Sequence, residues 1–218
     1  MSFGAVIFDW RGTLVTTVSW SEWARYALQR SGRDGSDEQV RGVVATLRSV
    51  PRLEDRLDCP GIDADAAFHR EVYFGVFADA GLDDELARAL YAVESDPSYN
   101  HFAQDTEATL RELHRRGIRV AVVSDIHFDV RPAFDAVGLS GLVDTFTLSF
   151  EQGVQKPDPL MFTRTLAALG CDPAAALMVG DRPRPDGGAV ECGITTLLLP
   201  SLRNEHHQRL HHVLAMTR

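Results

Sequence analysis

The sequence lacks the features that mark secreted and membrane-spanning proteins. It has three cysteines, an odd number with no C-x-x-C pair, so we expect neither a disulfide framework nor a zinc ribbon. No apolar run approaches the roughly 20 residues that a membrane-spanning helix needs. The N-terminal residues contain neither the basic segment nor the long apolar segment of a signal peptide. We therefore expect a cytoplasmic protein with reduced thiols and no membrane partner.

Positive charge is also scarce. Lys and Arg number 22 against 31 Asp and Glu, which gives a net charge of -9. An acidic chain without a long basic run is poorly suited to bind a phosphate backbone, so we expect no nucleic-acid partner. The length of 218 residues and a hydrophobic fraction of 44% fit one large domain or a domain that carries an insertion. The oligomeric state is left open.

Short apolar runs alternate with helical patterns over most of the chain. The predicted strands cover residues 5–8, 119–123, 145–149, 176–179 and 195–199. Continuous apolar runs are typical of parallel strands that are covered on both faces. Helical spacing of leucines over residues 106–116 and 159–169, each followed by glycine, predicts helices between the strands. This alternation predicts a doubly wound α/β sheet.

The stretch 16–101 interrupts the alternation. It contains four helical patterns, at 21–30, 37–48, 63–80 and 83–93. We therefore predict an α/β core domain formed by residues 1–15 and 102–218, with an all-helical domain of residues 16–101 inserted after the first strand. Trp20 and Trp23 are expected to pack inside this insertion rather than to bind a ligand.

Polar residues follow four of the predicted strands. The first is followed by Asp9, the second by Ser124 and Asp125, the third by a loop with Lys156, and the fourth by Asp181 with Asp186 further on. In a parallel sheet these groups meet at one edge, where ligands bind. Three crowded carboxylates call for a hard cation such as Mg²⁺. Lys156, the Ser124 hydroxyl and the amides near Thr13 could hold a phosphoryl group, and one carboxylate could attack it.

These segments resemble the motifs of the haloacid dehalogenase superfamily, in its branch with a helical cap after the first motif. The matching residues are 8–14, 123–125, 155–159, and 179–181 followed by 186–189. Together they span nearly the whole chain in the order that the family shows. The resemblance implies a Rossmann-like core, a four-helix cap, Mg²⁺ and an aspartyl nucleophile.

The resemblance also implies a role for each matching residue. Asp9 would attack the phosphoryl group, and Ser124 and Lys156 would hold it. Asp9, Asp181 and the main-chain carbonyl of Arg11 would bind Mg²⁺, with Asp186 supporting the metal site. Thr13 and Asp125 are placed with Ser124 among the substrate-binding residues, and Asp125 is also expected to cap the following helix.

Arg11 departs from the pattern of the family's phosphatases. Those enzymes carry at this position a second aspartate, which protonates the leaving group and then activates water. Arginine stays protonated and is a poor proton donor or base. Loss of a general acid/base slows a reaction by roughly 10²–10⁴-fold. The Arg11 cation could instead pair with Asp9 or Asp181, or clamp a phosphate or carboxylate.

Three functions remain open. The leading hypothesis is a Mg²⁺-dependent hydrolase of a small phosphorylated metabolite that works through a phospho-Asp9 intermediate and is slow because of Arg11. The second is a catalytically impaired protein that binds a phosphorylated ligand or a partner. The third is hydrolysis of another bond, such as carbon–halogen. Carbon–phosphorus cleavage of the family's known type needs a cap lysine, and residues 16–101 contain none.

The histidines do not suggest a ligand set. His69, His101, His114 and His127 have no mutual spacing that suggests a ligand set. His207 and His211 are four residues apart and could share the face of a solvated terminal helix. Cys59, Cys171 and Cys192 are expected to be unreactive thiols.

Overall fold

A five-stranded parallel sheet organises the chain. The computed structural model describes residues 3–218, and its strands are β1 (Ala5–Phe8), β2 (Arg119–Ser124), β3 (Thr145–Leu148), β4 (Ala176–Gly180) and β5 (Thr195–Leu198). They lie in the order β3-β2-β1-β4-β5. Phe8 at the end of β1 is level with Val122 of β2 and Val179 of β4. The Rossmann-like α/β fold predicted from the sequence is confirmed.

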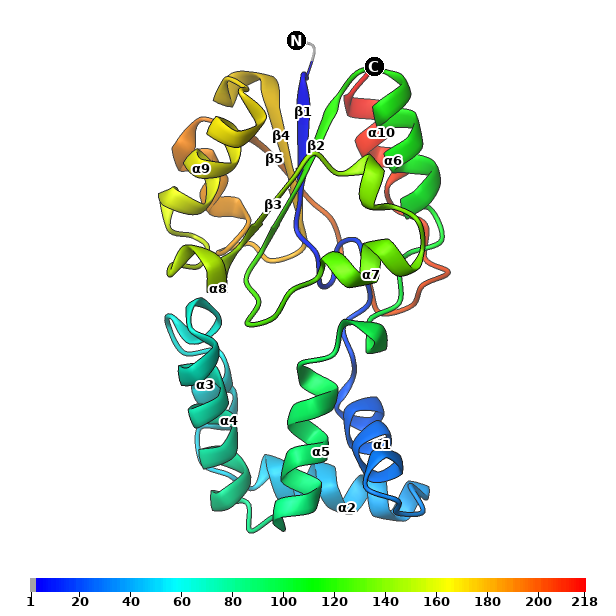
Figure 1. Ribbon diagram of the computed structural model, residues 1–218, viewed down its shortest axis with the longest axis vertical. Helices are drawn as coiled ribbons and strands as arrows, with labels where there is room; N and C mark the ends of the chain where they lie inside the picture. Colours follow the sequence, from blue (N-terminus) through cyan, green and yellow to red (C-terminus); the bar gives the residue numbers. More distant parts are fainter. Residues whose placement is uncertain (1–2) are drawn as a thin grey trace.

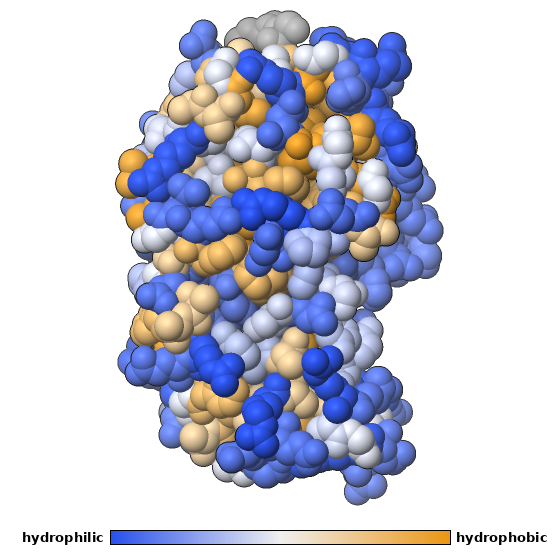
Figure 2. All heavy atoms as spheres, viewed as in Figure 1, coloured by the Kyte–Doolittle hydropathy of each residue, from blue (hydrophilic) through white to orange (hydrophobic). Residues whose placement is uncertain are grey.

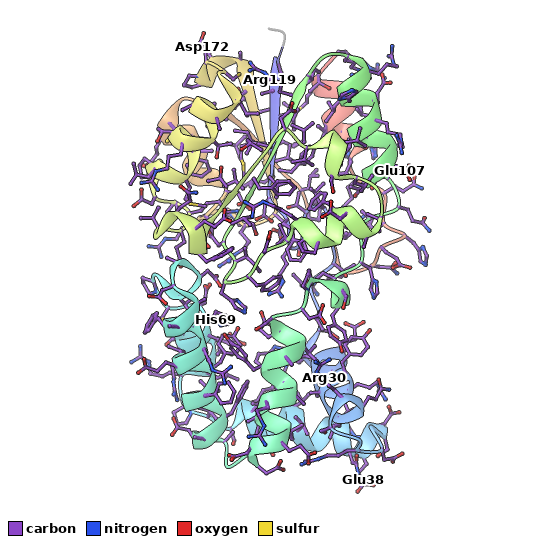
Figure 3. All side chains as sticks on the ribbon, viewed as in Figure 1. Arg30, Glu38, His69, Glu107, Arg119 and Asp172 are labelled. Atoms are coloured by element: carbon purple, nitrogen blue, oxygen red, sulfur yellow. The ribbon has the colours of Figure 1, made fainter. Side chains whose placement is uncertain are left out.

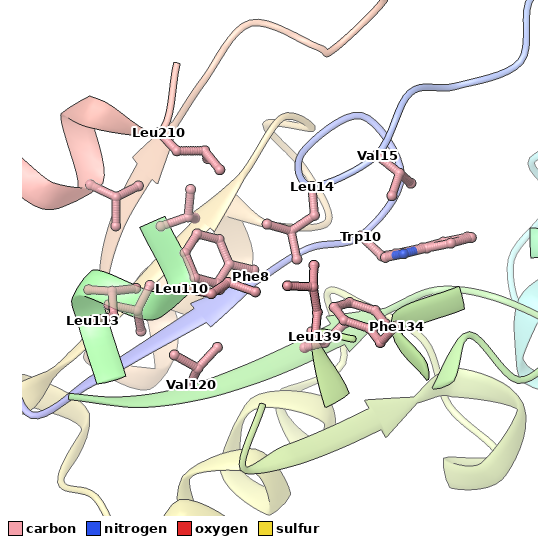
Figure 4. Close-up of a cluster of buried hydrophobic side chains, with 14 of the residues drawn as sticks. Phe8, Trp10, Leu14, Val15, Leu110, Leu113, Val120, Phe134, Leu139 and Leu210 are labelled. Atoms are coloured by element: carbon pink, nitrogen blue, oxygen red, sulfur yellow. The ribbon is translucent and has the colours of Figure 1, made fainter. Parts of the chain in front are cut away.

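Helices cover both faces of the sheet (Figure 1). The first face is covered by α6 (Thr106–Arg115), α7 (Arg131–Ala136) and α10 (His211–Met216), and the second by α9 (Pro159–Leu169). Residues of β1 alternate between the faces, as the two-residue period of a strand requires. Val6 and Phe8 join Leu110 of α6 in the first core, shown in Figure 4, and Ile7 joins Phe162 in the second. Burial on both faces explains why the strands are continuously apolar.

Short helical turns complete the α/β part. They are α8 (Ser149–Gln152) and the 3₁₀ segments η3 (Ser140–Leu142), η4 (Pro173–Ala175) and η5 (Gly187–Cys192). Ser149, predicted at the end of a strand, instead begins α8. The predicted helix shared by His207 and His211 is wrong, because α10 begins only at His211.

The helical insertion, defined here as α1 to η2, lies between β1 and β2. Its helices are α1 (Trp20–Arg30), α2 (Asp37–Arg48), α3 (Leu53–Leu57), α4 (Ala66–Asp79) and α5 (Asp84–Glu94), with 3₁₀ segments η1 (Ile62–Ala64) and η2 (Pro97–Tyr99). It therefore has five α-helices where four were expected. The third predicted helix starts at Ala66 and not at Asp63, because the Asp65 side chain accepts the N–H groups of Ala67 and Phe68. The predicted domain boundaries at 15/16 and 101/102 stay a prediction.

The helical insertion has a hydrophobic core of its own. The Trp23 indole N–H donates to the Leu90 carbonyl at 2.8 Å, which joins α1 to α5. The same ring packs against Phe77 of α4 at a centroid distance of 6.0 Å, and Trp20 lies against it at 5.5 Å. Both tryptophans pack in the insertion as expected, and both also line a pocket that Arg11 and Glu94 share. Figure 1 shows that α4 begins and α5 ends on the side that faces the sheet, which places both helix ends near the strand-end residues.

On the face seen in Figure 2, hydrophilic side chains are spread over both parts of the molecule, with apolar side chains showing between them. Large exposed apolar residues such as Phe68, Val137 and Val190 come from different elements. No helix within residues 3–218 is long and apolar enough to span a bilayer.

Replacing Leu90 by Ala tests the importance of the insertion's core. Leu90 is fully buried, so the substitution removes apolar contacts and leaves a cavity. We expect the free energy of unfolding to fall by about 2–5 kcal/mol, measured by urea denaturation. Leu160→Ala is the matched control, because Leu160 is 44% exposed in a helix and its loss should cost less than about 1 kcal/mol. Equal losses in the two variants would contradict an independent core in the insertion.

Candidate active site

Parallel pairing brings the first and fourth strand ends together. Asp9 follows β1, and its amide donates to the Val179 carbonyl of β4 at 2.8 Å. Asp181 follows β4, which is in register with β1. The carboxylates of Asp9, Asp181 and Asp186 each place an oxygen within 4.8 Å of the others. The predicted meeting of these three side chains is therefore observed.

Lys156 lies at the centre of the carboxylates. Its ammonium donates to Asp9 Oδ1 and to Asp186 Oδ1, both at 2.6 Å, and the residue is 3% exposed. It is the one lysine in the sequence. The Lys156 backbone N–H donates to Asp125 Oδ1 at 2.7 Å. Asp125 therefore fixes the lysine loop, and its expected role as a helix cap is wrong because α7 begins only at Arg131.

Asp186 fixes the loop after β4. Its Oδ2 atom accepts the backbone N–H groups of Asp181 at 3.0 Å and Arg182 at 2.9 Å. With Oδ1 on Lys156, both oxygens of Asp186 are already engaged. Its position thus suits a supporting role better than a direct metal contact.

A glycine permits the close approach of the β1 and β4 loops. Gly12 has φ +80°, and a Cβ atom at this position would lie 2.3 Å from Asp181 Oδ2. Any other residue would push the Asp181 carboxylate away from Asp9.

Arg209 supports the β1 loop from the C-terminal segment. Its guanidinium donates to the carbonyls of Thr13 at 2.7 Å and Gly12 at 3.2 Å. The Thr13 hydroxyl is buried without a hydrogen-bond partner, and Ser124 is buried at the end of β2. Sequence analysis missed Arg209, because nothing in the C-terminal segment signals that it reaches the first loop.

The site carries more negative than positive charge. Asp9, Asp125, Asp181 and Asp186 surround one ammonium group. Burial raises the pKa of Asp9 to about 7, although the charge of Lys156 opposes this shift, and burial also raises the pKa of Asp125 and Asp181. Among residues 3–218, no hydrogen-bond partner is found for the buried atoms Asp9 Oδ2 and Asp181 Oδ1. Two free carboxylate oxygens in an over-acidic site are the donors that a hard divalent cation such as Mg²⁺ prefers, so the residues fit that ion.

Arg11 turns away from the carboxylates. Its guanidinium contacts Glu94 Oε1 at 2.5 Å and the Glu94 carbonyl at 2.9 Å, and it lies 5.4 Å from the centre of the Phe128 ring. Glu94 is the last residue of α5, so this ion pair joins the β1 loop to the helical insertion. The suggested pairing of Arg11 with Asp9 or Asp181 is therefore not what the structure shows.

A second polar cluster lies between the helical insertion and the sheet. The rings of His69, at the start of α4 (Figure 3), and His127, after β2, stack with centroids 3.4 Å apart, and Asp63 of η1 faces both. Burial lowers the pKa of His69 to about 3 and of His127 to about 2, and burial raises that of Asp63 to about 7. The sequence spacing of these histidines suggested no ligand set, and the structure nevertheless brings His69 and His127 together. The position of His127 three residues after Ser124, beside a predicted site, was the available signal.

An opening connects the Lys156 site to solvent. A pocket of about 600 Å³ is lined by Lys156 and Asp181, by Arg182 and Arg184 of the β4 loop, and by Asp58 of the insertion. Arg182 reaches across it to Asp58, with Nη2 and Oδ1 2.9 Å apart. The part of the pocket mouth that the α/β core forms therefore contains arginines.

The chain belongs to the haloacid dehalogenase-like hydrolase family, whose model matches residues 3–192. It is 34% identical to the phosphoserine phosphatase of Thermus thermophilus over 63% of this chain and 58% of that protein. It is 33% identical to bovine haloacid dehalogenase-like hydrolase domain-containing protein 3 over 56% of this chain and 51% of that protein. The chain spans about half the length of the curated relatives it matches. The L-2-haloacid dehalogenase of Xanthobacter autotrophicus has the same fold, with a TM-score of 0.66 at 22% identity over 99% of this chain and 84% of that one.

Asp181→Asn should stabilise the metal-free protein. The ionised form of Asp181 is disfavoured by burial, so its folded pKa lies above the unfolded value and its ionisation costs stability as pH rises. We expect a gain of about 1 kcal/mol at pH 8 in EDTA, and a smaller gain at pH 5, by chemical denaturation. The exposed-carboxylate control Asp34→Asn should change stability by less than about 0.5 kcal/mol. Destabilisation by Asp181→Asn at pH 8 would contradict carboxylate crowding.

Proposed function

We propose that the protein is a Mg²⁺-dependent phosphatase of small phosphorylated metabolites that works through a phospho-Asp9 intermediate. The observation that carries the proposal is the contact of Lys156 with Asp9 at 2.6 Å, next to the free oxygens of Asp9 and Asp181. A nucleophile, a fixed cation for the phosphoryl oxygens and a pair of metal donors thus lie at one edge of the sheet.

The residues of the site fit the two chemical steps. Asp9 attacks phosphorus through a carboxylate oxygen, an acyl-phosphate bond forms, and the bond to the leaving alcohol breaks. Water then attacks the acyl phosphate and releases phosphate from Asp9. Lys156 favours the ionised form of Asp9 against the effect of burial and neutralises phosphoryl oxygens, while Ser124 and the loop at Thr13 hold them. Mg²⁺, bound by Asp9, Asp181 and the Arg11 carbonyl, would neutralise charge on the transferred group.

The entrance favours small anionic substrates. Arg182 and Arg184 line the pocket at its mouth, and the helical insertion covers the site from the other side. Relatives named phosphoserine phosphatase, ribulose-1,5-bisphosphate 5-phosphatase and glyceraldehyde 3-phosphate phosphatase support a small phosphorylated metabolite. We do not favour carbon–phosphorus cleavage of the type that needs a cap lysine, since the sequence has one lysine and Lys156 lies in the core.

A panel of phosphate monoesters tests the proposal. With Mg²⁺ we expect slow phosphate release by the native protein, no release in EDTA, and a loss of activity of at least about 10³-fold in Asp9→Asn, because the nucleophile is gone. Asp34→Asn is the matched control and should retain full activity. Absence of turnover with every ester, with phosphate binding unchanged in Asp9→Asn, would support the non-catalytic alternative. Chloride release from 2-haloacids would support the dehalogenase alternative.

The Arg11–Glu94 pair tests the cause of slow turnover. The double variant Arg11→Asp/Glu94→Gln places a carboxyl group two residues after Asp9. It also removes the Glu94 carboxylate, which would otherwise be left without the Arg11 guanidinium. We expect kcat on p-nitrophenyl phosphate to rise by about tenfold or more, within the range that general acid/base catalysis contributes. Glu94→Gln alone should show no such gain. A folded double variant with unchanged or lower kcat would contradict the role assigned to position 11.

A further inference from the structure

The second polar cluster gathers the ligand types of a transition-metal site within 4.8 Å of one another. His69 Nε2 and His127 Nδ1 each lie 3.9 Å from the same atom, Asp63 Oδ1. We propose that these three side chains bind a transition-metal cation, with Zn²⁺ as the natural candidate, and that this cation clamps the helical insertion onto the core. The proposal does not depend on the phosphatase proposal, because the Lys156 site contributes none of its ligands.

In each histidine ring, the nitrogen that points away from Asp63 is held by a hydroxyl group. His69 Nδ1 lies 3.3 Å from the Tyr91 hydroxyl, and His127 Nε2 lies 2.9 Å from Ser95 Oγ. These contacts leave the other nitrogen of each ring, called the inner nitrogen below, turned toward Asp63. Metal-binding histidines are oriented in the same way, by a hydrogen bond at the nitrogen that does not bind the metal.

The inner nitrogen of His127 has no partner in the structure as described for residues 3–218. Nδ1 of His127 is buried without a hydrogen bond, and its side chain is 3% exposed. A buried polar atom without a partner is costly, and a bound cation would satisfy it. The low pKa values of both rings keep them neutral, as metal ligation requires.

The groups around the cluster permit a positively charged ion to bind among these three side chains. Arg11 is the cation that acts on both rings, and its charge is offset by Glu94 at 2.5 Å. Asp63 is fixed at its backbone, where its N–H donates to Gln155 Oε1 at 3.2 Å and its carbonyl accepts from Ser149 Oγ at 2.6 Å. Because these contacts hold the Asp63 backbone, its carboxylate oxygens are not needed to fix this loop. The carboxylate therefore stays opposite the histidines.

Two nitrogens and one carboxylate oxygen favour Zn²⁺ or Co²⁺ over Mg²⁺, which prefers oxygen ligands. Ligand atoms around tetrahedral Zn²⁺ lie about 3.3 Å apart, given bond lengths near 2.0–2.1 Å. The 3.9 Å separations must therefore shorten by about 0.6 Å, and the stacked rings, 15° from parallel, must tilt so that their inner nitrogens converge. The ring centroids, now 3.4 Å apart, must also separate, because two imidazoles that bind one ion point their in-plane lone pairs at it. Metal binding therefore requires both histidine side chains to rotate.

The ligands come from both parts of the molecule. Asp63 and His69 belong to the helical insertion, whereas His127 follows β2 of the core. A cation bound by all three would hold the insertion over the Asp9 edge of the sheet, beside the existing Ser95–His127 contact. Its chemical role is that of a structural clamp.

Co²⁺ titration with Mg²⁺ in excess tests the site. We expect one Co²⁺ per chain with the strong visible absorption of a nitrogen-ligated, low-coordinate ion, and displacement of that ion by Zn²⁺. His127→Asn and Asp63→Asn should weaken binding by about 100-fold or more, since loss of an outer partner alone costs 10–100-fold. Ser95→Ala should cost about tenfold for that reason.

Matched controls separate this site from others. His114→Asn and His211→Asn remove exposed histidines, and Asp181→Asn alters the oxygen-only site, so all three should leave the Co²⁺ absorption unchanged. Loss of the absorption in His211→Asn but not in His127→Asn would overturn the proposal. Because a core variant can fail to fold, anomalous diffraction from crystals of the native protein soaked in Zn²⁺ supplies a second test. A peak between His69 and His127 is expected, and peaks confined to Asp9 or the C-terminal histidines would overturn the assignment.

Discussion

The contact of one buried ammonium group with two carboxylates is the interaction on which the catalytic edge depends. Lys156 holds Asp9 and Asp186 at 2.6 Å each, and without it the carboxylates at this edge would face one another uncompensated. The loop geometry follows from this contact. Asp186 accepts the amides after β4 with one oxygen while its other oxygen accepts from Lys156, which compensates its charge. Asp125 fixes the backbone that carries the lysine. The excess negative charge that remains favours a cation at this edge, and an anionic substrate as proposed would need that cation beside Lys156.

Arg11 links this edge to the helical insertion. A residue two positions after the proposed nucleophile, Asp9, could act on the leaving group, but the side chain of Arg11 is engaged by Glu94 at the end of α5. The same cation lies close enough to the His69–His127 pair to lower the pKa of both rings, after the larger effect of burial. The arginine at this position therefore cannot serve as a proton-transfer group. Its side chain instead makes a contact that orders the interface between the insertion and the core. Slow turnover by the proposed hydrolase would be consistent with this arrangement.

The sequence was sufficient for the parts of the structure that follow from local pattern. Apolar runs that end at Asp9 and Asp181, together with parallel pairing, were enough to predict that these carboxylates meet. The side chain of Arg11 could not be placed in this way, since its direction depends on where α5 ends against the core. Asp63 was assigned to a helix, because two aspartates compete to cap α4 and only the structure shows that Asp65 does so. That one-turn difference is what leaves the Asp63 carboxylate free to face the histidines.

The two clusters differ in the kind of cation that they can hold, and this difference follows from their donors. The Asp9 edge offers carboxylate oxygens beside an ammonium group, which suits a hard ion that keeps its water and can meet phosphate oxygens. The Asp63 cluster offers two neutral imidazoles that are already oriented by hydroxyl groups, which suits a softer ion bound by the protein itself. Because Mg²⁺ competes poorly for imidazole nitrogen, each cluster selects its ion without excluding the other. If both proposed ions bind, the clamp would keep the helical insertion over Asp9 independently of Mg²⁺, because the two ions share no ligand.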